Sequence, residues 1–175
     1  MKSIACFVAL LCAACGSSQE PIPASVAQGL TKELGQSLMS ALQTAMAEGG
    51  PSPAIEVCAT QAPMLAKQAS GPEYSVRRIG TRVRNVAQNT PTASELKVLQ
   101  TLTQEQPSFQ GQIDGRAVFL QGIFIPNALC LTCHGSPEQI PSEVQEALLT
   151  RYPEDQAVGY QLGDLRGAFV VEQVP

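Results

Sequence analysis

The chain has 175 residues, enough for one domain of common size with a core of its own. Acidic residues outnumber basic ones by 15 to 11, and this formal net charge of −4 argues against nucleic acid as a partner. Aromatic residues make up only 5% of the chain and Trp is absent, so a large flat apolar cofactor would supply core volume that side chains do not.

The first 14 residues are typical of an export signal. A short basic start precedes an apolar run, residues 4–14, which has the length of a signal-peptide core rather than of a membrane span. The run ends in CAACGSS, residues 12–18, which resembles the lipobox of bacterial lipoproteins with Cys15 as the lipidated residue. Cys12 stands where Leu is commonest in that motif, and ordinary cleavage after an A-x-A-like site is the alternative.

These signals predict a location and a domain organisation. We expect residues 1–14 to be removed as a lipoprotein signal peptide, residues 15–25 to form a lipidated tether, and residues 26–175 to form a single domain. Lipid on Cys15 would hold the domain to a membrane surface without a spanning helix. We expect an exported protein on the periplasmic face of the bacterial envelope, at the outer membrane because Gly16 is not an inner-membrane retention signal.

The N-terminal half of the domain is predicted to hold two helices and a strand. Apolar residues recur at helical spacing over residues 26–47, which end at Gly49-Gly50, and Pro51 and Pro53 then start a second helix that Pro63 kinks or divides. From Tyr74 the period changes to two and predicts a half-buried strand. In this strand Ile79, Thr81 and Val83 would face one way, and Arg78, Arg82 and Arg84 the other.

The C-terminal half alternates helices and strands. Residues 92–104 are predicted to be helical, with Thr92 and Glu95 at the spacing of a capping box. Residues 115–125 read as a buried strand, residues 141–151 as a short helix, and residues 159–171 as a turn and a last apolar strand. This order of elements predicts an α+β fold.

The only histidine of the chain lies in Cys130-Leu131-Thr132-Cys133-His134, a CxxCH motif. Two cysteines at this spacing reach the two vinyl groups of one haem, and the next residue presents its imidazole to the iron. A CxxC disulfide or half of a zinc site is the alternative, but zinc needs four ligands, and the chain has no second His or CxxC motif. Together with the export signal, the motif predicts one covalent haem c with His134 as axial ligand.

The second axial ligand has few candidates. Ligation by two histidines of one chain is excluded, and no Met or Cys follows His134. The upstream donors are Cys58, Met39, Met46 and Met64, of which Met39 and Met46 read better as core residues of a helix. The sulfur of Cys58 lies on the apolar face of its predicted helix, so Cys58 is either an iron ligand, which we favour because a thiolate suits ferric haem, or a small core residue.

Four arginines cluster on and just after the predicted first strand: Arg77, Arg78, Arg82 and Arg84. A solvated strand face is one interpretation of this cluster. The other is ion pairing with the propionates of the haem, because the guanidinium group matches a carboxylate in geometry.

Several motifs together are similar to the PAS-like haem c domains, a family found in exported proteins and in the sensory parts of receptors. The resemblance covers residues 26–171, and it rests on AIEVC at 54–58 followed by Ala62-Pro63, RVRN at 82–85, CLTCHG at 130–135, YP at 152–153, GY at 159–160, GD at 163–164 and RGA at 166–168. Val86 departs from the family, which usually has Pro there. The resemblance implies a PAS-like antiparallel sheet flanked by helices, with haem c between them and His134 and Cys58 as axial ligands.

Two functions fit a protein of this kind. The first is one-electron transfer or redox sensing by a low-potential haem, passed on to a redox partner or a separate signalling protein. The second is binding of nitric oxide or carbon monoxide at an open or displaceable sixth position. Peroxidase chemistry needs a positioned acid/base group, and the chain has no spare His, so we expect no enzyme activity.

Overall fold

The frame of the fold is a four-stranded antiparallel sheet with the spatial order β1-β4-β3-β2. The computed structural model describes residues 19–174, so the expected signal peptide and Cys15 lie outside the described residues. The strands are β1 (Tyr74–Gly80), β2 (Ser108–Ile113), β3 (Arg116–Phe124) and β4 (Leu165–Gln173). The helices are α1 (Ala24–Gly49), α2 (Pro51–Ala69), α3 (Val86–Asn89), α4 (Ala93–Leu99), α5 (Ala128–His134) and α6 (Ser142–Arg151). The prediction of an α+β fold is confirmed.

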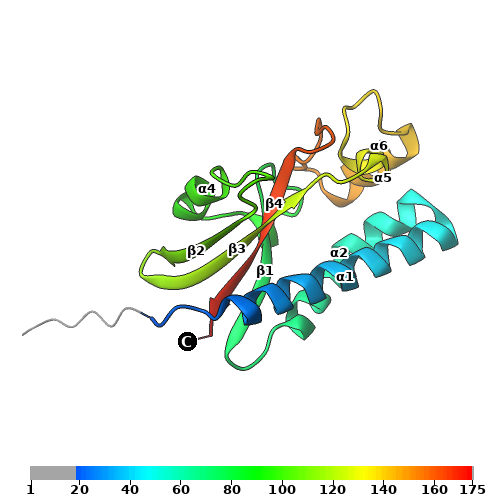
Figure 1. The fold of residues 1–175 in the computed structure, drawn as a ribbon. Coiled ribbons are helices and arrows are strands. Elements are labelled where there is room, and N and C mark those ends of the chain that lie inside the picture. The colour runs from blue at the N-terminus through cyan, green and yellow to red at the C-terminus, as the bar shows by residue number, and fades with distance from the viewer. Residues whose placement is uncertain (1–18, 175) are drawn as a thin grey trace, which may run out of the picture.

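Helices α1 and α2 form a hairpin that runs side by side along the sheet (Figure 1). Gly50 separates them with a φ of 78°, a left-handed conformation that suits glycine. Pro51 then occupies the first turn of α2, where a missing N–H removes no helical hydrogen bond. Pro63 lies inside α2, which continues to Ala69, so of the two predicted alternatives, a kink or a division at Pro63, the division is wrong.

Alternate residues of a strand point to opposite sides of the sheet. Each of the two sides packs against different helices. Val76, Phe119 and Val171 pack with residues of α1 and α2 such as Leu34 and Ala69. Leu120 and its neighbours on the other face pack against Leu99 of α4 and Leu102. The sheet is therefore the middle layer between the α1–α2 hairpin and α4.

Helices α5 and α6 lie together at one end of the sheet, close to the end of the α1–α2 hairpin (Figure 1). Ile55 of α2 packs with Val144 and Leu148 of α6, and Cys133 of α5 joins the same cluster. A second small cluster joins Ile125, just after β3, to Ala157 and Tyr160 in the loop before β4. These two clusters fix α5 between the hairpin and the strand ends.

The structure differs from the sequence prediction in the extent of two elements and in one strand that the sequence did not predict. The first strand ends at Gly80, so Arg82 and Arg84 follow it instead of belonging to it. The capping box of Thr92 and Glu95 is present, but α4 ends at Leu99 and not at Gln104. Strand β2 was not predicted, because its sequence SFQGQI has only a weak apolar alternation.

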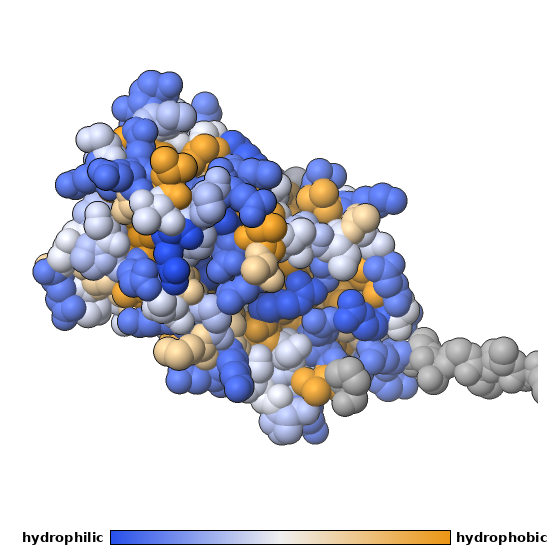
Figure 2. Space-filling view, turned by 180° about the vertical axis from the view of Figure 1, so that it is seen from behind, coloured by the Kyte–Doolittle hydropathy of each residue, from blue (hydrophilic) through white to orange (hydrophobic). Residues whose placement is uncertain are grey.

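The described part of the chain has no helix that is both long enough and apolar enough to cross a membrane. Figure 2 shows the face opposite to the view of Figure 1, where polar residues predominate and apolar ones form small separate patches. The most exposed large apolar side chains are those of Leu149, Leu162 and Met64, at 69%, 58% and 57%.

Candidate functional site

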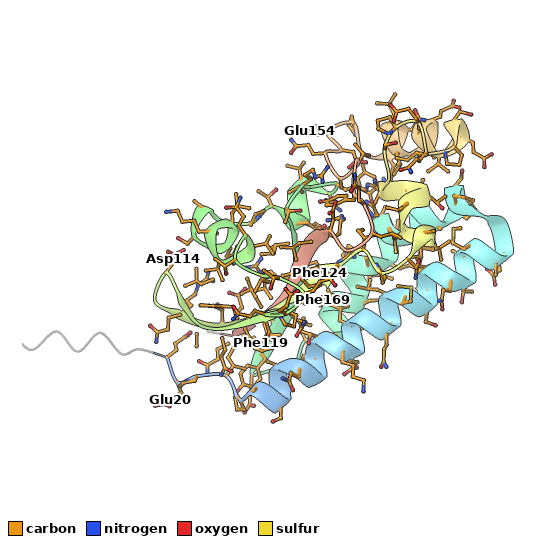
Figure 3. The ribbon with its side chains drawn as sticks, turned by 45° about the horizontal axis from the view of Figure 1, so that its top comes forward. Glu20, Asp114, Phe119, Phe124, Glu154 and Phe169 are labelled. Atoms are coloured by element: carbon orange, nitrogen blue, oxygen red, sulfur yellow. The ribbon has the colours of Figure 1, made fainter. Side chains whose placement is uncertain are left out.

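A cavity of about 280 Å³ lies between α1, α2, α5 and the sheet. It is lined mainly by apolar side chains, among them Phe124 of β3 and Phe169 of β4, which lie near each other in Figure 3. Four of the residues singled out in the sequence face this one space: Cys58, Cys130, Cys133 and His134. An apolar hollow with a few convergent polar groups is the usual form of a cofactor site.

The CxxCH motif forms helix α5, and both ends of this helix are specified by the sequence. The side chain of Asn127 caps its start by accepting a hydrogen bond from the backbone N–H of Leu129 at 3.1 Å. At its end, a Cβ on Gly135 would lie 2.6 Å from the carbonyl oxygen of Leu131, so a larger residue does not fit. Residues three and four apart on a helix share one face, so the helix brings Cys130, Cys133 and His134 to the cavity together.

The imidazole of His134 is held by one ring nitrogen. Its Nδ1 lies 2.7 Å from the carbonyl oxygen of Ala157, an acceptor that fixes the proton on Nδ1 and leaves the lone pair on Nε2 free. Burial lowers the pKa of His134 well below its usual value, and the nearby Arg166 and Arg84 lower it further. The ring is therefore neutral at neutral pH and oriented as a metal-ligating histidine is.

The loop at 157–160 fixes the end of α5 through backbone hydrogen bonds. The N–H of Tyr160 donates to the carbonyl of His134 at 2.9 Å, and the N–H of Gly159 donates to that of Gly135 at 2.7 Å. The Tyr160 ring meets the His134 ring edge-on, with centroids 6.1 Å apart, and its hydroxyl lies 2.8 Å from Oγ1 of Thr81. The histidine is thus supported from behind by a segment 23 residues further along the chain.

Arg84 joins this loop to the cysteine motif. Its Nε donates to Oδ2 of Asp155 at 2.8 Å, and its Nη2 donates to the carbonyl oxygens of Cys133 at 2.5 Å and Ala157 at 3.2 Å. Asp155 in turn accepts a hydrogen bond at 2.7 Å from the backbone N–H of Ala157, whose carbonyl holds His134. The Arg84 guanidinium is therefore a structural brace between α5 and the loop that positions its histidine.

Cys58 reaches the cavity from α2, on the side formed by the hairpin. Its thiol, like those of Cys130 and Cys133, is free of any disulfide within residues 19–174. Burial raises the pKa of the Cys130 and Cys133 thiols, so both are protonated at neutral pH. In the same part of the chain, no group of three or more His, Cys, Asp or Glu side chains is placed to hold a metal ion.

The methionines divide between the cavity and the surface. Met39 and Met46 line the cavity, and the expectation that both are core residues is wrong for Met39, which is 37% exposed. Met64 is 57% exposed and does not line the cavity. Two thioethers therefore remain near the site as alternatives to Cys58.

The structure separates the four arginines of the predicted cluster. Arg78 and Arg84 line the cavity. Arg77 points to the other face of the sheet, where it pairs with the buried Glu95 and with Glu172, and Arg82 stacks on the Tyr160 ring at 3.9 Å. The expectation that all four share one site is therefore wrong for Arg77 and Arg82.

A further cavity arginine, Arg166, was missed in the sequence. It lies in the RGA segment that contributed to the family resemblance, but a lone arginine at the start of a strand gives no signal of its direction. The three arginines that face the cavity come from β1, from the segment after β1 and from β4, so the fold alone brings them together.

Two comparisons with known proteins point to the same family. Comparison with curated proteins gave no match. Among solved structures, the chain resembles the crystal structure of the cyanobacterial heme-protein Tll0287 with 26% sequence identity and a TM-score of 0.57, over 86% of this chain and 91% of that chain. The family model described as Tll0287-like matches residues 17–174, and the chain therefore belongs to the Tll0287-like family.

Proposed function

We propose that this protein binds one haem c and acts as a one-electron carrier or redox sensor. The observation that carries the proposal is the convergence of Cys130, Cys133, His134 and Cys58 on one apolar cavity. Membership of a family that includes a haem protein supports it. When bound, haem iron supplies a one-electron couple whose potential is set by its axial ligands.

Each of these residues has a separate task in the proposal. The thiols of Cys130 and Cys133 add across two vinyl groups of the porphyrin, each S–H supplying the sulfur and the hydrogen, so they hold the group covalently. His134 offers Nε2 to the iron, because its Nδ1 is committed to the carbonyl of Ala157. Cys58, which lines the hairpin side of the cavity, would supply the second ligand of the iron.

A thiolate ligand has consequences for redox behaviour. Its negative charge stabilises ferric iron, so the reduction potential is lower than with a Met ligand such as Met39 or Met46. The same preference weakens the Cys58 bond on reduction and makes a ligand switch available. Such a switch would suit a sensor that passes its state to a redox partner or a separate signalling protein.

The place of action in the proposal is the outside of a bacterial membrane. An exported domain meets the conditions in which haem c is attached, and lipid on Cys15 would hold it at the envelope, at the outer membrane. The helices on both faces of the antiparallel sheet support the further proposal of a PAS-like fold, with the haem between the sheet and the α1–α2 hairpin.

Spectroelectrochemistry of protein produced with a haem c maturation system tests the proposal. We expect a reversible one-electron couple at low potential. We also expect the reduced form to bind carbon monoxide, because this gas ligates ferrous haem and reduction weakens the Cys58 bond that would otherwise block the sixth position. Rapid nitric oxide or carbon monoxide binding that is the same in Cys58→Ala would instead favour a gas-binding protein with an open site. A chain that matures without haem would contradict both.

A further inference from the structure

Two arginines face the cavity without a counter-charge. Arg84 is neutralised by Asp155 at 2.8 Å, but neither Arg78 nor Arg166 forms an ion pair with any residue that the structure describes. Within residues 19–174, the guanidinium of Arg166 makes a single hydrogen bond, a long one of 3.5 Å to the carbonyl oxygen of Arg82. Two adjacent walls of one apolar cavity thus present two unpaired positive charges.

Local strand geometry aims both side chains into the cavity. Arg78 lies two residues after Val76 on β1, so it shares the face that packs under the α1–α2 hairpin. On β4, Gly167 pairs with Ile123 and Leu165 with Phe124, so Arg166 is the extra residue of a β-bulge. A bulge turns a side chain away from the direction that strict alternation would give it.

Gly167 makes the bulge compatible with the neighbouring strand. A Cβ at this position would lie 2.1 Å from the carbonyl oxygen of Ile79, so β1 approaches β4 more closely here than any side chain permits. The close approach brings the Arg78 and Arg166 segments to the same end of the sheet. The RGA sequence therefore encodes the placement of the second arginine.

Burial makes these charges costly unless an anion meets them. Removal from water lowers the pKa of Arg78, and it lowers the pKa of Arg166 to about 10. The groups that face them are Cys58 and Tyr152 near Arg78, and Tyr160, Arg84, Asp155 and Arg78 itself near Arg166. Of these, Asp155 is the one carboxylate, and it is already paired with Arg84.

We propose that Arg78 and Arg166 form a paired anion site for the two propionate carboxylates of the haem. This inference rests on the proposed function and narrows it. Of the four clustered arginines, Arg78 keeps the role of propionate binding, whereas Arg77, Arg82 and Arg84 do not have it. Arg166, which lies outside that cluster, is the second propionate-binding residue. Two guanidinium groups on adjacent strands match two carboxylates that leave one edge of a porphyrin.

The test compares haem-loaded variants with the wild-type protein in two readouts. Arg166→Gln and Arg78→Gln remove one charge each, and Arg166→Lys keeps the charge but not the planar fork. Arg151→Gln is the matched control, because Arg151 is 44% exposed on α6 and pairs with Glu56 away from the cavity. The readouts are the propionate bending band in resonance Raman spectra and the reduction potential.

Loss of either cavity arginine should shift the propionate band and lower the potential. An uncompensated carboxylate stabilises ferric iron, and we expect a change of about tenfold in the ferric-to-ferrous equilibrium, which is about 59 mV for one electron. Arg166→Lys should retain the wild-type potential but shift the band, and Arg151→Gln should change neither readout. Should Arg166→Gln fail to mature, Arg78→Gln and Arg166→Lys decide the question with the same readouts.

The inference and the proposed function fail in different ways. Variants that carry haem c and show an unchanged band and potential would overturn the role of the two arginines and leave the haem proposal intact. Absence of covalent haem from the wild-type protein would overturn the proposed function itself.

Discussion

Replacing both Cys130 and Cys133 by Ala is expected to abolish covalent haem attachment completely. Helix α5 presents the two sulfurs to one cavity, and no other pair of thiols in residues 19–174 shares a helix face. Intact-mass analysis of protein made with a maturation system should give the mass of polypeptide plus one haem for the wild type and of polypeptide alone for the double variant. Each single variant should keep at most one thioether bond and yield much less loaded protein.

The matched control for this experiment is Cys58→Ala, the same chemical change on α2. Cys58 lines the cavity as a free thiol on α2 and is not part of the CxxC motif, so the covalent haem should remain. A double variant that still carries haem on denaturation would contradict the assignment. A wild-type mass lower by two hydrogens, with no haem, would show instead that the CxxC motif forms a disulfide.

Breaking the Arg84–Asp155 pair should cause the largest loss of stability among substitutions at the site. Both side chains are only 10% exposed, so removal of one partner leaves a buried charge without compensation. For Arg84→Gln and for Asp155→Asn we expect the free energy of unfolding to fall by about 3–5 kcal/mol. Urea denaturation of the haem-loaded proteins measures the change.

Two comparisons separate this pair from an ordinary surface contact. In the double variant the loss should be clearly smaller than the sum of the two single losses, because the residues act on each other. The exposed pair of Arg151 and Glu56, 44% and 59% exposed, is the control and should contribute about 0–1 kcal/mol. Additive effects, or single losses below about 1 kcal/mol, would show that Arg84 does not brace α5.

Much of the fold follows from patterns that act over short distances. The periodicity of α1, the prolines in the first turn of α2, the capping box of α4 and the buried apolar run of β3 all depend on neighbouring residues, and all were predicted. Strand β2 was not, because Gly111 interrupts the apolar alternation of Phe109 and Ile113 on its inward face, and only Ile113 is buried. The Asp114-Gly115 turn, with φ of 51° and 78°, was the one signal that could have revealed the hairpin, whose tip Figure 3 labels at Asp114.

The candidate site was predictable as far as its chemistry is local. The CxxCH motif carries its own spacing, and the helical face of Cys58 indicated an inward sulfur. The arginines were harder, because their directions depend on where β1 ends and on the bulge in β4. Arg77 and Arg78 are neighbours in sequence but lie on opposite faces of the sheet, and Arg166 comes from a strand 88 residues later than Arg78.

The central claim is that His134 of α5 and Cys58 of α2 hold one haem iron in the cavity. Electron paramagnetic resonance of the ferric protein, compared with Cys58→Ala and with Met39→Leu as the control for one of the two cavity thioethers, tests it most directly. We predict a low-spin signal with the compressed g-spread of thiolate ligation, lost in Cys58→Ala and retained in Met39→Leu. A high-spin signal that neither substitution changes would contradict the account.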